Sequence, residues 1–445
     1  MRTFRKFTTT LVSTVLLLGG PLADLAPVRA QGTFMAHALR DYDWDTWTNP
    51  PHMFALPTGN VGIGTASPGA KLEVAGQIHS TTGGYKFPDG TVQTTAAPGG
   101  VNYGQVFTVA QSGGDFPTIT QALNACVAPG PGNRYLVRVM PGNYAESFTC
   151  LSYVRLQGAG KEACEIQGTV TGVNDSVLDA FTVTGTILCP GTSPTITRNI
   201  INSPANGIWI TLGGKPWIQE NEIEDCGGWG VHCDGWDCNA WIIANKIERN
   251  ASGGVACTNS APTISNNRIL ENENYGIFLM GALNFPSEPT IDDNVIGRTE
   301  PPGMGVGIYL SDFAEPRIIA NDIWVNFTGI EIHPASQPSI MSNNINYNQG
   351  YGIRCFSSGS SKPVVIRGNH IHSNPLAGLE ASFCSPLVTH NDIINNDPAG
   401  LNPDIIYIGP PFPTFSMNIF DINPSAGTGA GGALNLTSAG APAMP

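Results

Sequence analysis

The segment P-T-I-T-R-N-I-I, residues 194–201, introduces a pattern that returns through the second half of the chain. The same spacing, P-x-I-x-x-N-x-I, recurs at P-W-I-Q-E-N-E-I (216–223), P-T-I-S-N-N-R-I (262–269) and P-R-I-I-A-N-D-I (316–323). Related copies place one Asn at the same point of the motif: Asn199, Asn221, Asn245, Asn267, Asn294, Asn321, Asn343, Asn369, Asn391 and Asn418. Successive Asn residues lie 22 to 27 positions apart, and a period in that range predicts a solenoid of stacked repeats.

The residue types within the motif favour strands over helices. Ile, Val and Thr predominate, and apolar residues alternate within each short run. The alternation breaks between the first Ile and the Asn, so a bend is expected there that turns both side chains toward the interior. Because Asn tolerates the left-handed backbone of a tight bend, we expect the Asn itself to adopt it. Stacked Asn amides would then form a hydrogen-bonded ladder along the solenoid.

This pattern resembles the right-handed parallel β-helix of the pectin-lyase-like superfamily, which has an internal Asn ladder. The resemblance spans roughly residues 106–423 and implies an all-β, single-stranded right-handed parallel β-helix with coils of ~22 residues. Residues 109–126, V-A-Q-S-G-G-D-F-P-T-I-T-Q-A-L-N-A-C, predict a strand, a Gly turn and a short amphipathic helix. The same resemblance implies that this helix covers the first coil, whose edge and core would otherwise be exposed. It implies a fold and leaves the function open.

The first 30 residues predict a secretory signal peptide. Arg2, Arg5 and Lys6 form a basic start, residues 11–18 an apolar core, and V-R-A (28–30) a small-residue cleavage site. A membrane anchor is the alternative, but the apolar run is shorter than the ~20 residues that span a bilayer. No later stretch is long enough to span a membrane, so a secreted or cell-surface protein is expected.

The remaining segments flank the solenoid. Residues 31–56 form an irregular lead-in, and residues 57–104 form a small β segment and linker that resembles parts of phage tail fibres and of exported fibre-like stalks. That resemblance implies a possible homotrimer; the alternative is a β-appendage that caps the solenoid. Residues 105–193 are expected to be the N-terminal cap and first coils, 194–423 the regular β-helix and 424–445 a flexible tail.

The charge balance limits the partners. The chain has 21 Lys and Arg against 34 Asp and Glu, a net charge of −13. An acidic surface argues against binding nucleic acid or anionic membranes. It also disfavours polyanionic substrates unless a cation bridges them.

The ten Cys residues of an exported chain permit disulfides. Three of them are expected at inward strand positions as buried thiols: Cys233, Cys257 and Cys355. Four that fall in turns or near the start of the solenoid are better disulfide candidates: Cys150, Cys164, Cys226 and Cys238. No C-x-x-C pair is present, so zinc is not expected.

The second half of each repeat, G-I-x-I, predicts a third strand whose outward residue lies two positions after the Gly. These outward residues should form a strip with neighbours ~4.8 Å apart: Trp209, His232, Ala256, Phe278, Tyr309, Glu331, Arg354 and Glu380. In the resembled enzymes the corresponding sheet lines the substrate cleft. Trp209, Phe278 and Tyr309, with His232, could therefore bind a polysaccharide or cell-surface glycan by stacking on sugar rings; the alternative is that these rings pack beneath their own loops.

Charged residues occupy the other part of the strip. Glu331, Arg354 and Glu380 could be ordinary cross-strand charge pairs. If they are catalytic, the carboxylates of Glu331 and Glu380 lie two coils apart, a separation near the ~6.5–9.5 Å between the carboxyl groups of an inverting glycosidase. Alternatively, Glu331 and Glu380 could hold Ca²⁺, with Arg354 as a lyase base. No resident cofactor other than this possible Ca²⁺ is expected. Glu224 and Glu248 on adjacent coils should be screened by Lys246 and Arg268.

Motifs of the resembled enzymes are mostly missing. Of the polygalacturonase signatures N-T-D, D-D, G-H-G and R-I-K, only Asp292-Asp293 is present, and Asp293 falls at the bend beside Asn294. The D-F-I-F-G segment of pectinesterases and the Asp cluster of the pectate lyase calcium site are not found. The leading interpretation is thus an exported glycan-binding or adhesive module. The alternatives are a polysaccharide hydrolase or lyase, and a structural spacer.

Overall fold

A computed structural model describes residues 103–299, 305–356, 363–396, 404–409 and 413–420, together with short strands outside these ranges. The chain divides into two compact units, Met1–Gly100 and Val101–Pro445. Among the described residues, no helix is both long and apolar enough to cross a membrane. The expected signal peptide lies outside the described residues, and so does the lead-in except for one short strand.

Five short strands are described in the first unit. Strands β1 (Met53–Ala55), β2 (Val61–Ile63) and β3 (Leu72–Val74) form one sheet, in which β2 pairs antiparallel with β1 and parallel with β3. Strands β4 (Tyr85–Lys86) and β5 (Val92–Gln93) form an antiparallel pair. The pairing is within one chain, and the expected homotrimer stays a prediction.

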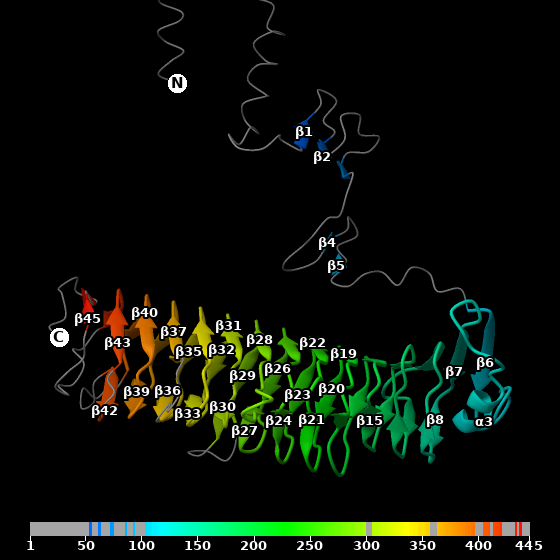
Figure 1. Cartoon of the computed structure of the whole chain (residues 1–445). Coiled ribbons are helices and arrows are strands. Elements are labelled where there is room, and N and C mark those ends of the chain that lie inside the picture. The colour runs from blue at the N-terminus through cyan, green and yellow to red at the C-terminus, as the bar shows by residue number, and fades with distance from the viewer. Residues whose placement is uncertain are drawn as a thin grey trace, which may run out of the picture. The chain divides into compact units, whose positions relative to one another are not determined.

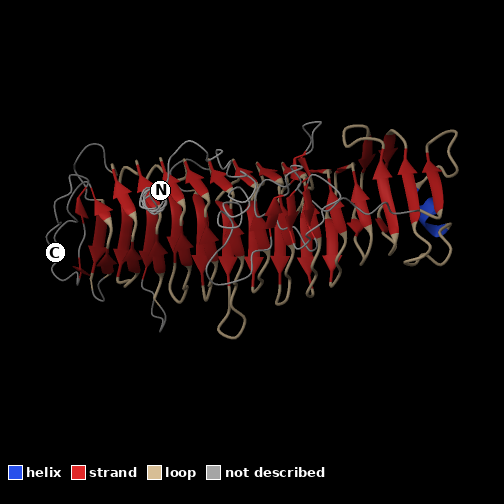
Figure 2. Cartoon of the chain, turned by 90° about the horizontal axis from the view of Figure 1, so that it is seen from above, coloured by secondary structure: helices blue, strands red, loops and turns tan. Residues whose placement is uncertain are grey.

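Three long parallel sheets make up the second unit (Figures 1 and 2). Sheet 1 contains β6 (Gln105–Val109), β7 (Tyr135–Val139), β10 (Val154–Gly158), β13 (Val177–Asp179), β16 (Thr195–Thr197), β19 (Trp217–Gln219), β22 (Trp241–Ile243), β25 (Thr263–Ser265), β28 (Thr290–Asp292), β31 (Arg317–Ile319), β34 (Ser339–Met341), β37 (Val365–Arg367), β40 (Leu387–Thr389), β43 (Thr414–Ser416) and β45 (Gly432–Ala433). Sheet 2 contains β8 (Gly142–Tyr144), β11 (Cys164–Ile166), β14 (Thr182–Val183), β17 (Ile200–Ile201), β20 (Glu222–Glu224), β23 (Lys246–Glu248), β26 (Arg268–Leu270), β29 (Val295–Gly297), β32 (Asp322–Trp324), β35 (Asn344–Asn346), β38 (His370–His372), β41 (Asp392–Ile394), β44 (Ile419–Phe420) and β46 (Leu436–Thr437). Sheet 3 contains β9 (Phe148–Thr149), β12 (Val170–Thr171), β15 (Ile187–Pro190), β18 (Ile208–Thr211), β21 (Trp229–Asp234), β24 (Gly253–Thr258), β27 (Tyr275–Met280), β30 (Val306–Ser311), β33 (Thr328–Ile332), β36 (Tyr351–Phe356), β39 (Ala377–Ser382) and β42 (Ile405–Ile408).

Each repeat supplies one coil of a right-handed parallel β-helix, as predicted. In the coil that begins at residue 194, β16 lies in sheet 1, β17 in sheet 2 and β18 in sheet 3. Each strand pairs with the equivalent strand of the next coil, so the first Ile of successive motifs stack: Ile196 pairs with Ile218, and Ile218 with Ile242. These three side chains are at most 1% exposed and form part of a continuous apolar core.

The Asn ladder is present inside the solenoid. Asn221, Asn245 and Asn267 are at most 2% exposed. The Oδ1 of Asn245 accepts hydrogen bonds from the backbone N–H and the Nδ2 of Asn221, both at 3.0 Å. In the same way, the Oδ1 of Asn267 accepts hydrogen bonds from the backbone N–H and the Nδ2 of Asn245. Because buried amides need partners, each Asn satisfies the backbone of the previous coil at the bend between sheets 1 and 2.

The left-handed residue of this bend was predicted wrongly. It is the residue before the Asn: Glu220 has φ 55°, Ala244 has φ 54° and Asp293 has φ 53°. The Asn side chain must point into the interior to meet the Asn of the next coil along the solenoid axis, and the preceding residue therefore makes the turn. These preceding residues extend into solvent or toward the surface, which explains their variety.

A second ladder was missed in the sequence. It lies between sheets 2 and 3, five residues after the first ladder on the same coil, and comprises Asn250, Asn272, Asn326, Asn348, Asn374 and Asn396. Thus Asn326 Nδ2 donates to Asn348 Oδ1 at 3.0 Å. Cys226 occupies the equivalent position one coil earlier, and its backbone N–H donates to Asn250 Oδ1 at 3.1 Å. The spacing N-x-I-x-x-N was the signal in the sequence.

Helix α3 (Ile119–Asn124) covers the N-terminal end of the solenoid, as predicted (Figure 1). Its residues Ile119, Ala122 and Leu123 are buried and face β6 and β7. The Thr118 Oγ1 accepts a hydrogen bond from the Gln121 N–H, which caps the helix start.

Cysteine pairing differs from the prediction. Cys355 in β36 forms a disulfide with Cys384, which follows β39 on the next coil. The stacking of coils brings together two residues that lie 29 positions apart, about one repeat. The four proposed disulfide candidates, Cys150, Cys164, Cys226 and Cys238, are buried free thiols, and so are Cys233 and Cys257, as expected.

Candidate functional site

The outer face of sheet 3 carries the predicted strip, and its residues are in register. Trp209 pairs with His232, His232 with Ala256, and Ala256 with Phe278. The same line continues through Tyr309, Glu331, Arg354 and Glu380. The Gly two positions before a strip residue packs tightly against the next coil; a Cβ added to Gly207, for example, would lie 2.6 Å from the Gly230 carbonyl oxygen.

The aromatic part of the strip forms stacked pairs. Trp209 is 39% exposed, and its ring lies parallel to His232, with centroids 6.4 Å apart and an interplanar angle of 8°. Phe278 and Tyr309 stack with centroids 5.5 Å apart and an interplanar angle of 6°. Ala256 between these pairs is 1% exposed.

Further aromatic residues, not identified from the sequence, flank the strip. Trp229 begins strand β21, and its ring is 5.7 Å from Phe278 and 6.2 Å from Tyr275. Tyr275 in turn lies 5.0 Å from Tyr309. Trp229 and Tyr275 occupy the first position of their strands, three residues before a strip residue. The repeated aromatic at that offset was the available signal.

Burial alters the acidity of several strip residues. It raises the pKa of the Tyr309 phenol to about 12, with nearby Tyr275 and Glu331 adding to the effect. It lowers the pKa of His232, which Asp234 only partly offsets. At neutral pH the Tyr309 hydroxyl therefore stays protonated and can donate a hydrogen bond.

The charged part of the strip contains two hydrogen-bonded pairs of side chains, Glu331 with His333 and Arg354 with Glu380. Glu331 Oε1 lies 2.8 Å from His333 Nε2, and the His333 ring lies 4.7 Å from that of Tyr309. One coil further, Arg354 Nε donates to Glu380 Oε2 at 2.9 Å. The sequence analysis missed His333, which follows β33 and faces outward two residues after Glu331.

Arg354 is held from three sides. Its guanidinium carbon lies 4.9 Å from the Tyr351 ring centroid and 4.4 Å from that of Phe356, a cation–π arrangement. Glu380 also accepts a hydrogen bond from Ser382 Oγ at 2.7 Å, and its side chain is only 5% exposed. The Arg354 side chain is 30% exposed, whereas Glu380, its register partner on the next coil, is buried.

This geometry does not fit the Ca²⁺ site considered for Glu331 and Glu380. Arg354 lies between Glu331 and Glu380 in the sheet register. It already forms an ion pair with the Glu380 carboxylate, which a Ca²⁺ ion would need as a ligand. Within the described ranges, no group of three or more His, Cys, Asp or Glu side chains is arranged to hold a metal ion.

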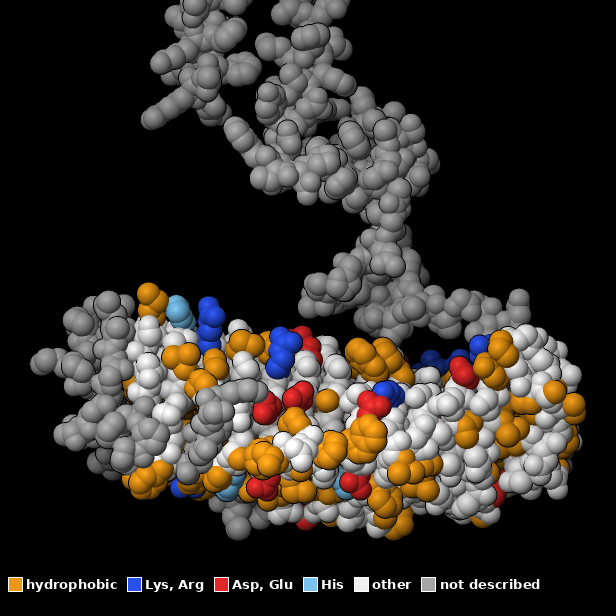
Figure 3. Space-filling model, in the orientation of Figure 1, with side chains coloured by type: hydrophobic (Ala, Val, Ile, Leu, Met, Phe, Trp, Pro, Cys, Tyr) orange, Lys and Arg blue, Asp and Glu red, His pale blue; other side chains and the backbone are white. Residues whose placement is uncertain are grey.

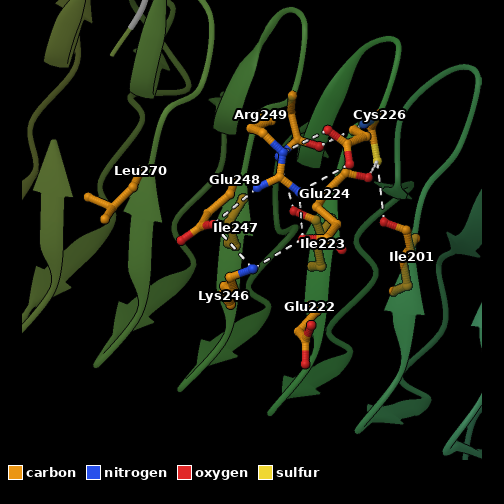
Figure 4. Close-up of polar contacts among 12 residues, drawn as sticks. Ile201, Glu222, Ile223, Glu224, Cys226, Lys246, Ile247, Glu248, Arg249 and Leu270 are labelled. Carbon is orange, nitrogen blue, oxygen red and sulfur yellow. Dashed lines mark hydrogen bonds and ion pairs between the residues drawn. The ribbon is translucent and has the colours of Figure 1, made fainter. Parts of the chain in front are cut away.

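Glu224 and Glu248, on sheet 2, belong to an ion-pair network, as expected (Figure 4). Lys246 Nζ lies 3.1 Å from Glu224 and 3.2 Å from Glu248, and Arg249 contacts both carboxylates. Arg268 Nε donates to Glu248 Oε1 at 2.9 Å. Burial alone would raise the pKa of Glu248, but the hydrogen bonds from Arg268 and Lys246 outweigh it and lower that pKa. The network stabilises sheet 2.

The surface also carries aromatic residues away from the strip. Trp217 and Trp241 stack on sheet 1 with centroids 5.4 Å apart, and they are 37% and 45% exposed. Figure 3 shows one face of the solenoid, on which hydrophobic side chains are interspersed with a few charged ones. Aromatic surface is thus not confined to sheet 3.

The sequence of the solenoid matches a known family. The family described as right handed beta helix region matches residues 185–314 and 284–397. The chain contains a right-handed β-helix region. This agrees with the resemblance seen in the repeats, and no curated protein matches the chain at a significant level.

Several solved structures are similar to part of this chain. The PL6 family alginate lyase AlyGC has a TM-score of 0.49 and 12% identity, with 76% of this chain and 55% of that chain covered. A mutant of the periplasmic alginate epimerase AlgG has a TM-score of 0.46 and 13% identity, with 65% and 77% covered. The catalytic unit of the GH87 alpha-1,3-glucanase from Streptomyces thermodiastaticus has a TM-score of 0.45 and 17% identity, with 74% and 65% covered.

Proposed function

We propose that this β-helix protein is a carbohydrate-active enzyme that binds a polysaccharide along sheet 3 and acts on it beside Glu331. The observation that carries the proposal is the continuous register of the strip: stacked rings lead directly to a carboxylate–imidazole pair and an oriented guanidinium. Flat apolar faces followed by a few convergent polar groups are what a sugar-binding site requires.

Each group in the charged part has a role in this proposal. Glu331 and His333 exchange a proton with a bound hydroxyl or glycosidic oxygen. Because the two side chains are hydrogen-bonded, a proton can pass from one to the other. Tyr309, kept protonated, donates a hydrogen bond to the sugar. Arg354 binds the substrate, and the buried Glu380 positions Arg354.

We further propose that the substrate is neutral. The chain has a net charge of −13, and Arg354 is already paired with Glu380. A polyanionic substrate would be repelled by Glu331 and by the net negative charge of the protein, since the charge of Arg354 is already balanced by Glu380. Neutral sugars would instead gain from stacking on Trp209 and Phe278.

The export predicted from the first 30 residues remains part of the proposal. The disulfide Cys355–Cys384 supports it, because such bonds persist in oxidising compartments outside the cytoplasm. A homotrimer through residues 57–104 is likewise proposed, and sedimentation of the full chain tests it.

A panel of neutral polysaccharides and polygalacturonate, assayed for new reducing ends and unsaturated products, tests the activity. We expect Glu331→Gln to lower turnover of a neutral substrate about 100-fold or more, whereas Glu162→Gln, an exposed control on an early coil, leaves it unchanged. Turnover that survives Glu331→Gln refutes the proposed role of Glu331.

The second candidate is a glycan-binding or adhesive module without turnover, which the stacked pairs of the strip favour. Binding of a polysaccharide without product, weakened by Trp209→Ala and Tyr309→Ala, supports this candidate. If the panel shows neither turnover nor binding, the chain is better described as a structural spacer.

A further inference from the structure

A second site lies outside the strip, where the chain passes from sheet 3 to sheet 1. A pocket of about 380 Å³ opens there, formed by the turns that follow β21, β24 and β27 on three successive coils. Its volume falls within the range typical of small-ligand sites. Nothing in the proposed activity uses this pocket.

Two aromatic rings form walls of the pocket. Trp236 is 68% exposed and Phe285 is 51% exposed, and their ring centroids are 6.4 Å apart at an interplanar angle of 36°. Leaving two large rings in water is unfavourable, and such surfaces commonly mark binding sites.

The turns that carry these rings are fixed by hydrogen bonds. Phe285 and Ala282 exchange backbone hydrogen bonds of 2.9 Å in both directions, which closes a tight hairpin. Asp237 beside Trp236 forms an ion pair of 2.9 Å with Lys215 and accepts a hydrogen bond of 3.0 Å from Asn239 Nδ2. The walls are therefore pre-positioned, which lowers the entropic cost of binding.

The rest of the lining is polar and rich in acceptors. Asp237 and Glu288 supply carboxylates, and Asn239, Asn259 and Asn284 supply amides. The Asn259 Oδ1 is buried and has no hydrogen-bond partner among the described residues. An acceptor-rich lining matches the hydroxyls of a ligand, and the two carboxylates disfavour an anion.

We propose that this pocket is a second saccharide-binding site that takes a neutral sugar. The C–H face of a sugar ring stacks on Trp236 and Phe285, and its hydroxyls donate to the carboxylate and amide oxygens. Asn239 lies two residues before Trp241, whose ring stacks on Trp217 on sheet 1. The site is separate from the strip and does not depend on catalysis there.

Calorimetric titration of the full chain with cellohexaose, mannohexaose, maltohexaose and hexagalacturonate tests this site. The titrations use a Trp209→Ala/Tyr309→Ala background, so that binding to the strip is removed. We expect at least one neutral hexasaccharide to bind, and Trp236→Ala and Phe285→Ala each to weaken that binding about five- to tenfold. Tyr347→Ala, which removes an exposed aromatic from a different turn, serves as the control and leaves it unchanged.

Several results would overturn the proposal. These are no binding of any neutral hexasaccharide to the background protein, an affinity that neither pocket variant alters, and tighter binding of hexagalacturonate. Circular dichroism verifies that each variant is folded, and Glu288→Gln gives a second, conservative perturbation that should also weaken binding. If the wild-type protein shows no turnover of any neutral polysaccharide but the pocket still binds a hexasaccharide, only the proposed function is refuted.

Discussion

Removal of one ladder side chain tests the physical basis of the fold. In the wild type, Asn267 Oδ1 accepts from the Asn245 backbone N–H at 2.9 Å and from Asn245 Nδ2 at 3.0 Å. Asn267 Nδ2 donates to the Ile242 carbonyl at 2.7 Å and to Asn294 Oδ1 at 3.0 Å. Asn267→Ala deletes all of these hydrogen bonds at a position that is 2% exposed.

The magnitude follows from what the substitution leaves unpaired. The buried Asn245 N–H loses its acceptor, and an unsatisfied buried group costs about 1–3 kcal/mol. The lost amide hydrogen bonds add about 1 kcal/mol net. We therefore expect Asn267→Ala to reduce the free energy of unfolding by about 2–4 kcal/mol.

Hydrogen exchange measured by mass spectrometry suits a solenoid, because coils can open locally. We expect faster exchange in peptides that contain Asn245 and Asn267, together with a lower thermal midpoint. Thr263→Ala is the control, since Thr263 lies on the outer side of the same coil, and it should change stability by less than about 0.5 kcal/mol. If Asn267→Ala is as mild as Thr263→Ala, the ladder does not stabilise the fold and the reasoning is wrong.

Three further predictions follow from the structure. Cys384→Ser should destabilise the last coils by about 3–4 kcal/mol, because the bond closes a loop of 29 residues; an unchanged melting curve under non-reducing conditions would contradict this. The pKa of Glu248 is lower in the folded state, so its contribution to stability is present above its unfolded pKa and is lost as pH falls through the folded value. Glu248→Gln should therefore make the thermal midpoint fall less steeply in acid than it does in the wild type. An equally steep fall would show that the ion pairs of Glu248 do not stabilise the protein. NMR titration should give His232 a pKa below the ordinary histidine value, and Asp234→Asn should lower it further, because Asp234 partly offsets the effect of burial; a rise on that substitution would show that Asp234 does not raise this pKa.

Local sequence predicted the strip because a parallel β-helix turns sequence period into spatial register. Once the Gly of G-I-x-I is aligned between coils, the residue two positions later must face outward, and Trp209 to Glu380 follow. His333 and Tyr275 were not found, because they belong to the outward positions on either side of the strip. Their rings contact Tyr309, which belongs to the coil after Tyr275 and before His333.

Prediction of the cysteines failed for a related reason. Cys355 was expected to be a buried thiol because its inward position could be read from the alternation in its strand. Its partner Cys384 lies beyond the end of β39, where no alternation exists and only the stacking of coils brings the two sulfurs together. The left-handed residue before each ladder Asn likewise depends on the direction that the amide must take to reach the next coil.

The sequence by itself determined the coil: its period, its strands, its inward Ile and Asn residues and the outward strip, because all of these follow from the spacing along one repeat. Only the tertiary structure decided what meets across coils. The contact of the Tyr309 ring with His333, the burial of Glu380 beside Arg354 and the pocket between Trp236 and Phe285 join residues from different repeats. The lengths and paths of the turns set these distances, and turns carry no repeated pattern from which they could be read.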